Sequence, residues 1–304
     1  MTLYTEQRKN IVRTWLLITS FLVLIIGLGW FFSQMYGNPG ILYIATGVSV
    51  FMSIGSYWWS DKLVLSMYKA KEVTMRDNPE LLRIVENLAI SAGLPMPRVY
   101  IIPESSPNAF ATGRNAEHAV VAVTEGLLSR LDRSELEGVL AHELSHIGNK
   151  DMLVSTVVVV LVGLISIASD FFMRSMMWGG LRNRDNDRGG NQIQGILLIV
   201  GIVLMILSPI IATLIQLAVS RRREFLADAS GALLTRYPEG LISALKKISN
   251  AEPMKKATEA TAHLFFENPF RGDKKNDKTS FLVKLFMTHP PIEERIKALE
   301  SLRV

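Results

Sequence analysis

The stretch from Thr14 to Ser60 contains no charged residue, and this feature constrains the fold of the chain more than any other. A Gly-Asn-Pro-Gly break at residues 37–40 divides it into two apolar helices, predicted at about 14–33 and 41–59. Each is long enough to span the hydrocarbon core of a bilayer, which takes about 20 helical residues. Aromatic residues gather near the helix ends, as in interfacial belts: Trp15, Trp30, Tyr36, Trp58 and Trp59. No clear cleavage site follows the first run, so we expect an uncleaved membrane anchor.

Basic residues flank this predicted hairpin at its two outer ends and are missing from the loop that connects its helices. They are Arg8, Lys9 and Arg13 before it, and Lys62, Lys69, Lys71 and Arg76 after it. Lysine and arginine are enriched on the cytoplasmic side of membrane proteins. We therefore expect the amino terminus, and the polar region that follows Asp61, to lie in the cytoplasm.

A second pair of apolar segments occurs at about 152–173 and 193–219. Arginines in the loop between them are balanced by Lys150 and by the three arginines at 221–223, so charge counting leaves open whether these segments span the bilayer fully. The sequence then divides into an N-terminal transmembrane hairpin (1–60), a first polar half (61–151), a second apolar hairpin (152–220) and a second polar half (221–304). Nearly half of the residues are hydrophobic, as expected for a membrane protein with a sizeable polar part.

The net charge of +5 does not indicate a nucleic-acid partner. The basic residues cluster beside the apolar runs, and no basic patch is interleaved with aromatic residues. Attraction to the membrane surface is the simpler explanation of this charge. We expect the lipid bilayer to be a partner and nucleic acid not to be one.

The polar region carries the sequence His142-Glu143-Leu144-Ser145-His146, which has the pattern H-E-x-x-H. On a helix, residues four apart lie on one face, so both imidazoles can reach a single metal ion. The chain has no cysteine, so any metal site must use His, Asp or Glu. Zinc is the usual occupant of such a pair, and Glu143 could hold a water molecule at the ion.

The flanking sequence favours a helix at this position over a surface segment with two solvated histidines. Residues 134–137 (Ser-Glu-Leu-Glu) read as a capping box that opens the helix, and Gly148-Asn149 as its stop. Apolar residues recur between them with helical spacing: Leu136, Val139, Leu140, Leu144 and Ile147. The motif is thus predicted to lie on an amphipathic helix, as metal binding by both histidines requires.

Around this helix the sequence predicts a small α/β region. A helix should run from Asn78 to about Ala92 and end at Gly93, followed by strands at 98–102, 108–113 and 118–124. An edge strand beside a metal helix can pair with an extended peptide. The residues in question are Asn108, Ala109, Phe110 and Ala111, although spacing alone favours ordinary sheet structure for them. We interpret His118, in a predicted strand, and His263, in a predicted helix, as structural.

A third metal ligand is needed, since catalytic zinc sites use three protein ligands and leave the fourth position to water. Glu224 is the best candidate, because Asp228 lies four residues later on the same helix face and could accept a hydrogen bond from a ligand histidine. A solvated acidic face following three arginines would have the same pattern. Spacing alone leaves both interpretations open. Beyond this segment we expect helices at 239–249 and 290–302 and a loop at 267–280.

Taken together, these motifs resemble the HtpX family of membrane-bound zinc metallopeptidases, which is related to the CAAX prenyl proteases. The resemblance covers essentially the whole length and includes the paired N-terminal spans, residues 108–113 (Asn-Ala-Phe-Ala-Thr-Gly), the H-E-x-x-H helix, Glu224-x-x-x-Asp228, Thr-His-Pro-Pro at 288–291 and Arg295. It implies a mainly α-helical membrane protein with a small β-sheet. A zincin-like (gluzincin) metalloprotease domain would be attached to about four transmembrane helices.

The resemblance also implies a role for each matching residue. His142, His146 and Glu224 would bind one zinc ion per chain, and Glu143 would act as the general base. Outside this set, Asp228 would orient a ligand histidine, Arg295 would pair with Asp228, and His289 would face the substrate and stabilise an oxyanion. From the residues alone, His289 before two prolines is equally well explained as a helix-start histidine.

The activity implied is that of a zinc metalloendopeptidase of the bacterial plasma (inner) membrane. It would cleave misfolded or damaged membrane proteins at the cytoplasmic face, as part of a stress response. Alternatives are a CAAX-type prenyl-protein peptidase, an intramembrane protease and a non-catalytic membrane scaffold with a structural zinc. Charged residues on both sides of the motif disfavour the intramembrane protease. An oligomer is compatible with the sequence, which does not determine the oligomeric state.

Overall fold

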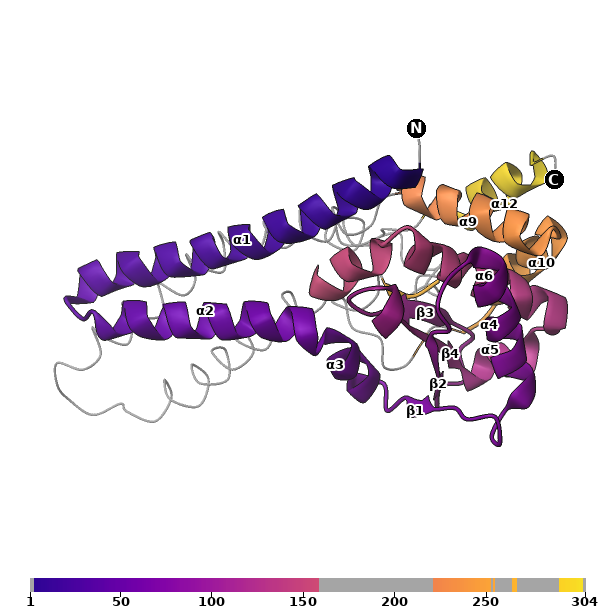
Figure 1. The fold of residues 1–304 in the computed structure, drawn as a ribbon, viewed down its shortest axis with the longest axis horizontal. Helices are drawn as coiled ribbons and strands as arrows, with labels where there is room; N and C mark the ends of the chain where they lie inside the picture. Colours follow the sequence, from indigo (N-terminus) through magenta and orange to yellow (C-terminus); the bar gives the residue numbers. More distant parts are fainter. Residues whose placement is uncertain (1–2, 159–220, 253, 255–263, 267–289, 303–304) are drawn as a thin grey trace, which may run out of the picture.

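The computed structural model describes residues 3–158, 221–252, 254, 264–266 and 290–302. Helices α1 (Leu3–Tyr36) and α2 (Gly40–Trp58) form an antiparallel hairpin that extends away from the rest of the described chain (Figure 1). Within them, Asn10–Met35 and Gly40–Trp58 are long and apolar enough to cross a membrane. The two helices predicted from the uncharged stretch are therefore confirmed. The second predicted hairpin lies almost entirely outside the described residues.

Helices α1 and α2 approach each other closely at Gly29 of α1, where an added methyl group would clash with the Cβ of Ala45 in α2. Ser49, Ser53 and Ser56 of α2 are buried, while many large apolar side chains of both helices are exposed. Close packing through small residues is typical of helices that associate in lipid, where apolar side chains gain nothing by leaving their surroundings. Near the polar end of the hairpin, the rings of Trp15 and Tyr57 stack with centroids 6.2 Å apart.

The polar region is built on a four-stranded mixed sheet with the order β1-β2-β4-β3. Its strands are β1 (Lys71–Glu72), β2 (Arg98–Ile102), β3 (Ala109–Thr112) and β4 (Val120–Thr124). β2 and β4 are parallel, whereas β1 pairs with β2, and β3 with β4, in antiparallel fashion. The three strands predicted from the sequence are present, each within one or two residues of its expected bounds. β3 forms one edge of the sheet.

Both faces of this sheet are covered. Helices α4 (Pro79–Ala92) and α6 (Arg133–Gly148) pack on the face that carries Val121 and Val123. Helix α3 (Ser60–Met67) and Phe265 pack on the opposite face, which carries Phe110. The remaining described elements are a 3-10 helix (Ala116–His118), α5 (Glu125–Arg130), a helical segment at 151–158, α9 (Arg221–Thr235), α10 (Pro238–Ser249) and α12 (Ile292–Glu300).

Helix boundaries follow the sequence signals, with one correction. α4 begins after Asn78, whose side chain accepts a hydrogen bond from the Leu81 amide, and ends at Gly93 in a left-handed conformation (φ 65°), as predicted. The prediction of a capping box at Ser134 is wrong. The box is formed two residues earlier, because Asp132 accepts from the Glu135 amide (3.0 Å) and the Glu135 carboxylate accepts from the Asp132 amide (2.9 Å). Asp132 is as good a helix-capping residue as serine and stands at the observed helix start.

Candidate metal centre

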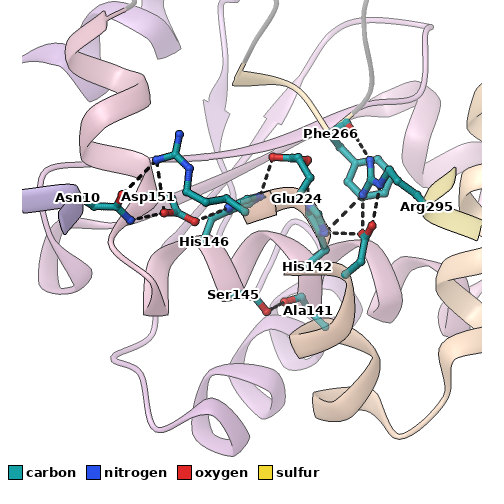
Figure 2. Close-up of polar contacts among 11 residues, drawn as sticks. Asn10, Ala141, His142, Ser145, His146, Asp151, Glu224, Phe266 and Arg295 are labelled. Carbon is teal, nitrogen blue, oxygen red and sulfur yellow. Dashed lines mark hydrogen bonds and ion pairs between the residues drawn. The ribbon is translucent and has the colours of Figure 1, made fainter. Parts of the chain in front are cut away.

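Three side chains converge where α6 meets α9 (Figure 2). The Nε2 atoms of His142 and His146 are 3.1 Å apart, and the carboxylate oxygens of Glu224 lie 3.8 Å from the first and 3.7 Å from the second. One ligand atom from each residue falls within 4.8 Å of the other two. His142 and Glu224 are buried and His146 is partly exposed. The two histidines and the candidate third ligand, 78 positions apart by number (224 − 146), thus form one cluster.

A glycine allows the two helices to approach closely enough for this cluster to form. Gly231 lies on the same face of α9 as Glu224 and Asp228, at successive helical turns. A methyl group at Gly231 would stand 3.0 Å from the backbone nitrogen of His142, which is closer than side chains normally approach. The absence of a side chain at this crossing therefore brings both carboxylates of α9 within reach of α6.

His142 is held from the side of α9 and α12. Its Nδ1 lies 2.9 Å from Asp228 Oδ1. Arg295 donates to both oxygens of Asp228, from Nε at 2.8 Å and Nη2 at 2.6 Å, and to the carbonyl oxygen of Phe266 at 3.0 Å. The Phe266 ring lies edge-on to the His142 ring and beneath the Arg295 guanidinium. The expected contacts of Asp228 and Arg295 are both present, while the sequence analysis missed Phe266.

His146 is held differently, by residues that the sequence analysis did not predict. Its Nδ1 lies 3.1 Å from Oδ2 of Asp151, three residues after the end of α6. The other Asp151 oxygen accepts a hydrogen bond from the side-chain amide of Asn10, on α1, and lies 3.7 Å from Nη1 of Arg223 (Figure 2). The position of Asp151, five residues after His146, was the one local signal for this contact. No local pattern points to Asn10.

The surroundings of the two imidazoles give them opposite proton affinities. Burial lowers the pKa of His142 to about 4, although the nearby Asp228 favours the charged form. His146 is subject to the same effect of burial, but its hydrogen bond to Asp151 and the charge of Glu224 outweigh it and raise its pKa to about 9. At neutral pH His146 therefore carries a positive charge while His142 is neutral, and their Nε2 atoms are 3.1 Å apart. A divalent cation between the rings would take the place of the proton that carries this charge.

The donor set fits zinc. In both histidines Nδ1 faces a carboxylate, so it carries the ring proton and leaves the Nε2 lone pair directed at the common point. Two imidazole nitrogens and one carboxylate oxygen form one of the ligand sets of catalytic zinc, with a fourth position left for water. The cluster thus has the composition, the tautomers and the supporting acceptors that a zinc ion requires.

Glu143 stands next to this cluster and is almost fully buried. Burial raises its pKa to about 7, while the positive charge of His146 and a hydrogen bond from the Ala111 backbone amide act in the opposite direction. A carboxylate with a pKa near neutrality can both accept and return a proton at physiological pH. Glu143 is therefore suited to general acid–base work beside the three ligands.

The strand with the candidate substrate-binding residues lies beside α6. Ala109, Phe110 and Ala111 belong to β3, and Asn108 precedes it. Phe110 points into the core formed with Phe265, whereas the amide of Ala111 donates to Glu143. At the same open edge of the strand, the carbonyl oxygen of Ala109 accepts a hydrogen bond from the Phe266 amide at 2.8 Å. The open edge thus runs past the candidate base and is covered at Ala109 by Phe266.

Of the three histidines outside the metal cluster, only His118 lies among the described residues. His289, assigned a substrate-facing role, and His263 lie outside the described residues. The strand assignment of His118 is wrong, since this residue ends the 3-10 helix and is exposed. Its Nδ1 lies 2.7 Å from the Oδ1 of Asn115, which caps that short helix, so the asparagine stops strand β4 from beginning earlier.

Comparison with known proteins decides the family. The profile of peptidase family M48 matches residues 75–303. The chain belongs to this family. The match begins just before α4 and includes both the H-E-x-x-H helix and α9, so it contains every residue of the candidate metal centre except Asn10.

Similar proteins extend the likeness over almost the whole chain. A protease HtpX homolog of Pyrococcus furiosus is 49% identical over 294 residues, which is 96% of this chain and 95% of that protein. One from Lactobacillus helveticus is 47% identical over 310 residues, covering 99% and 100%. Among solved structures, S. mikatae Ste24p has a TM-score of 0.50 at 18% identity, with 98% of this chain and 67% of that chain covered. The family implies peptide or protein substrates and a metalloprotease mechanism.

Proposed function

We propose that this chain is a membrane-anchored zinc endopeptidase that hydrolyses peptide bonds of misfolded or damaged membrane proteins at the cytoplasmic face. The observation that carries the proposal is the convergence of His142, His146 and Glu224 around one point, with the buried carboxylate of Glu143 beside it. A structural zinc site closes all four positions with protein ligands. The arrangement of three ligands plus a base therefore favours catalysis over a scaffold role.

In this mechanism the residues divide the work. His142, His146 and Glu224 would hold the zinc ion, which when bound would lower the pKa of a water molecule and polarise the substrate carbonyl. Glu143 takes a proton from the attacking water molecule as the water oxygen forms a bond to the peptide carbon. It then passes the proton to the amide nitrogen as the carbon–nitrogen bond breaks, so the amine leaves neutral. The Ala111 amide holds the Glu143 carboxylate in place.

The edge of β3 supports binding of an extended substrate. The outward-facing backbone groups of an edge strand can pair with a peptide, which places the peptide along the strand. Because the amide of Ala111 is bonded to Glu143, a peptide paired at this edge lies next to the candidate base. The Phe266 amide already donates a hydrogen bond to the Ala109 carbonyl oxygen. A peptide bound along β3 therefore either ends its pairing before Ala109 or replaces the Phe266 amide as the donor to the Ala109 carbonyl oxygen.

Substitution of Glu143 by glutamine tests the mechanism. The zinc content should stay unchanged, and cleavage of a casein-type substrate by the detergent-solubilised full chain should fall at least about 100-fold, because general-base catalysis contributes about 10²–10⁴-fold. Glu137→Gln is the matched control, since Glu137 lies on the same helix and pairs only with Arg133 among the contacts described. Undiminished cleavage by Glu143→Gln would exclude the proposed base.

Two further measurements test the substrate class and the location. A prenylated carboxyl-terminal peptide, offered beside an unmodified unfolded membrane protein, separates the proposed activity from a CAAX-type peptidase. Preferred cleavage of the prenylated peptide would favour the alternative. A protease-cleavable tag inserted near Arg76, in the exposed turn before α4, should be degraded in inside-out vesicles and protected in right-side-out ones, if the metal centre lies on the cytoplasmic face.

A further inference from the structure

His146 depends on a residue of the first helix of the chain through only two hydrogen bonds. The first joins His146 Nδ1 to Asp151 Oδ2 at 3.1 Å. The second joins Asp151 Oδ1 to the side-chain nitrogen of Asn10 at 2.5 Å. Asn10 belongs to α1, at the end of the helix nearest the α/β region (Figures 1 and 2). A helix that is long and apolar enough to cross a membrane thus reaches a candidate metal ligand.

The chain turns at Lys150 to make this contact. Lys150 has a left-handed backbone (φ 57°) between α6 and the helical segment at 151–158. This single residue allows Asp151 to return alongside His146 with its second oxygen directed away from the histidine. That second oxygen is the one that meets Asn10.

Both ends of the Asn10 side chain are used. Its nitrogen donates to Asp151 and to the carbonyl oxygen of Asn149 at 3.2 Å, and its oxygen accepts from Nη1 of Arg223 at 3.3 Å. Asn10 is 0% exposed. A buried amide is costly unless it is hydrogen-bonded, so this geometry is strongly determined. An asparagine that served only to dock α1 would not need to donate a hydrogen bond to the carboxylate that orients His146.

We propose that Asn10 and Asp151 are positioning residues for His146, so that the metal centre is complete only when α1 is docked on the α/β region. Asp151 fixes the ring orientation and the tautomer of His146, and Asn10 fixes the orientation of Asp151. Arg223, next to Glu224, contacts both and ties the same support to α9. This inference rests on the proposed metal site, but not on the proposed peptidase activity.

The experiment measures zinc affinity of the full chain in detergent by competition with a chelator, for Asn10→Ala, Asp151→Asn and the double variant. Loss of a group that orients a metal ligand typically weakens metal binding by about 10–100-fold, and we expect Asp151→Asn to fall in this range. Asn10 is one hydrogen bond further from His146 than Asp151 is, so Asn10→Ala should weaken zinc binding by about 3–10-fold. In the double variant the two losses should be less than additive, because Asn10 acts through Asp151.

Controls separate positioning from docking. Thr14→Val alters a buried hydroxyl one turn further along α1, which bonds to the Asn10 carbonyl within the helix, and should leave zinc affinity unchanged. Cobalt substituted for zinc adds a spectroscopic readout, since its absorption bands should shift in Asn10→Ala and not in Thr14→Val. Asn10→Ser replaces Asn10→Ala if the latter does not accumulate as folded protein.

Two results would overturn the proposal. One is a zinc affinity of Asn10→Ala and Asn10→Ser within two-fold of the unmodified chain while Asp151→Asn binds more weakly. The other is full additivity in the double variant, which would mean that Asn10 only docks α1. A chain that binds zinc as expected but cleaves no peptide would contradict the proposed function and leave this inference standing.

Discussion

The two imidazoles of the metal centre lie four residues apart on one helix, yet they are supported in different ways. His142 rests on a buried ion pair, Asp228–Arg295, that joins α9 to α12. His146 rests on Asp151, whose partners are the neutral amide of Asn10 at 2.5 Å and the Arg223 guanidinium at 3.7 Å. One support lies within the part of the chain that the family profile matches, and the other reaches outside it to residue 10. The two sides of one site can therefore be altered separately.

The largest effect is expected from Arg295→Met, which removes the charge that supports the His142 side. Arg295 is 0% exposed and holds the pKa of Asp228 at about 2, against the opposing effect of burial. Its loss leaves a buried carboxylate without a counter-charge, which typically costs about 3–5 kcal/mol. A large drop in the thermal midpoint is the expected result.

The role of the Asp228 charge can be tested by a second substitution in the Arg295→Met variant. Asp228→Asn added to Arg295→Met should recover part of the lost stability, because the unpaired charge is removed as well. Arg133→Met is the control, since the Arg133–Glu137 pair of α6 is exposed and such pairs contribute at most about 1 kcal/mol. If Arg295→Met is no worse than Arg133→Met, the His142 side does not depend on this ion pair.

The next largest effect is expected in the pH dependence of the stability of the metal-free chain, and it arises from His146. The pKa of His146 is raised from its ordinary 6.5 to about 9, so the stability that it contributes is fully present below pH 6.5 and lost as pH rises through 9. A shift of this size corresponds to on the order of 3 kcal/mol. After chelation, the thermal midpoint should therefore fall between pH 6.5 and 9.

Asp151→Asn tests whether the pH dependence of stability arises from His146. Asp151 is the main partner that raises the pKa of His146, so its neutralisation should flatten the pH dependence. Asp228→Asn should not flatten it, because Asp228 contacts the other histidine. A slope that survives in Asp151→Asn would show that the charge of His146 is stabilised elsewhere.

The difference between the two sides also explains how much of the site the sequence could predict. Helical spacing alone places His142 with His146, and Glu224 with Asp228, on common faces. The Asn10–Asp151 contact joins positions 141 apart and has no periodicity to signal it. Asn10 stands at the start of an apolar run, where the sequence shows only a polar flank to a membrane helix.

The same reasoning applies to the fold. Helix and strand positions were predicted from residues that start or end an element locally. In α4 these are the capping residue Asn78, the first-turn proline Pro79 and the terminating glycine Gly93. The capping box was misplaced because two overlapping patterns, starting at Asp132 and Ser134, fit the same rule. The parallel pairing of β2 with β4 and the cover of Phe266 over β3 depend on tertiary contacts, which no local pattern encodes.

The smallest effect is expected from Gly231→Ala, which acts mainly through the position of α9 against α6. Alanine favours a helix over glycine by about 1 kcal/mol. Here, however, its methyl group would lie 3.0 Å from the His142 nitrogen and 3.2 Å from its Cα, and backbone atoms cannot turn aside. Overpacking of this kind costs about 1–3 kcal/mol, so the net change in stability should be small and unfavourable.

Metal binding is the more telling measurement for this variant. A displaced α9 moves Glu224 and Asp228 away from α6 but leaves Asp151, which lies outside α9, beside His146. Zinc affinity should therefore fall more than stability does, and Asp151→Asn should add a further but less than additive loss, because Arg223 of α9 also contacts Asp151. Gly148→Ala, at the end of α6, is the control, because its methyl group would meet only the Leu94 side chain at 3.9 Å. Equal zinc affinities in the two alanine variants would mean that the crossing at Gly231 does not set the position of the carboxylates.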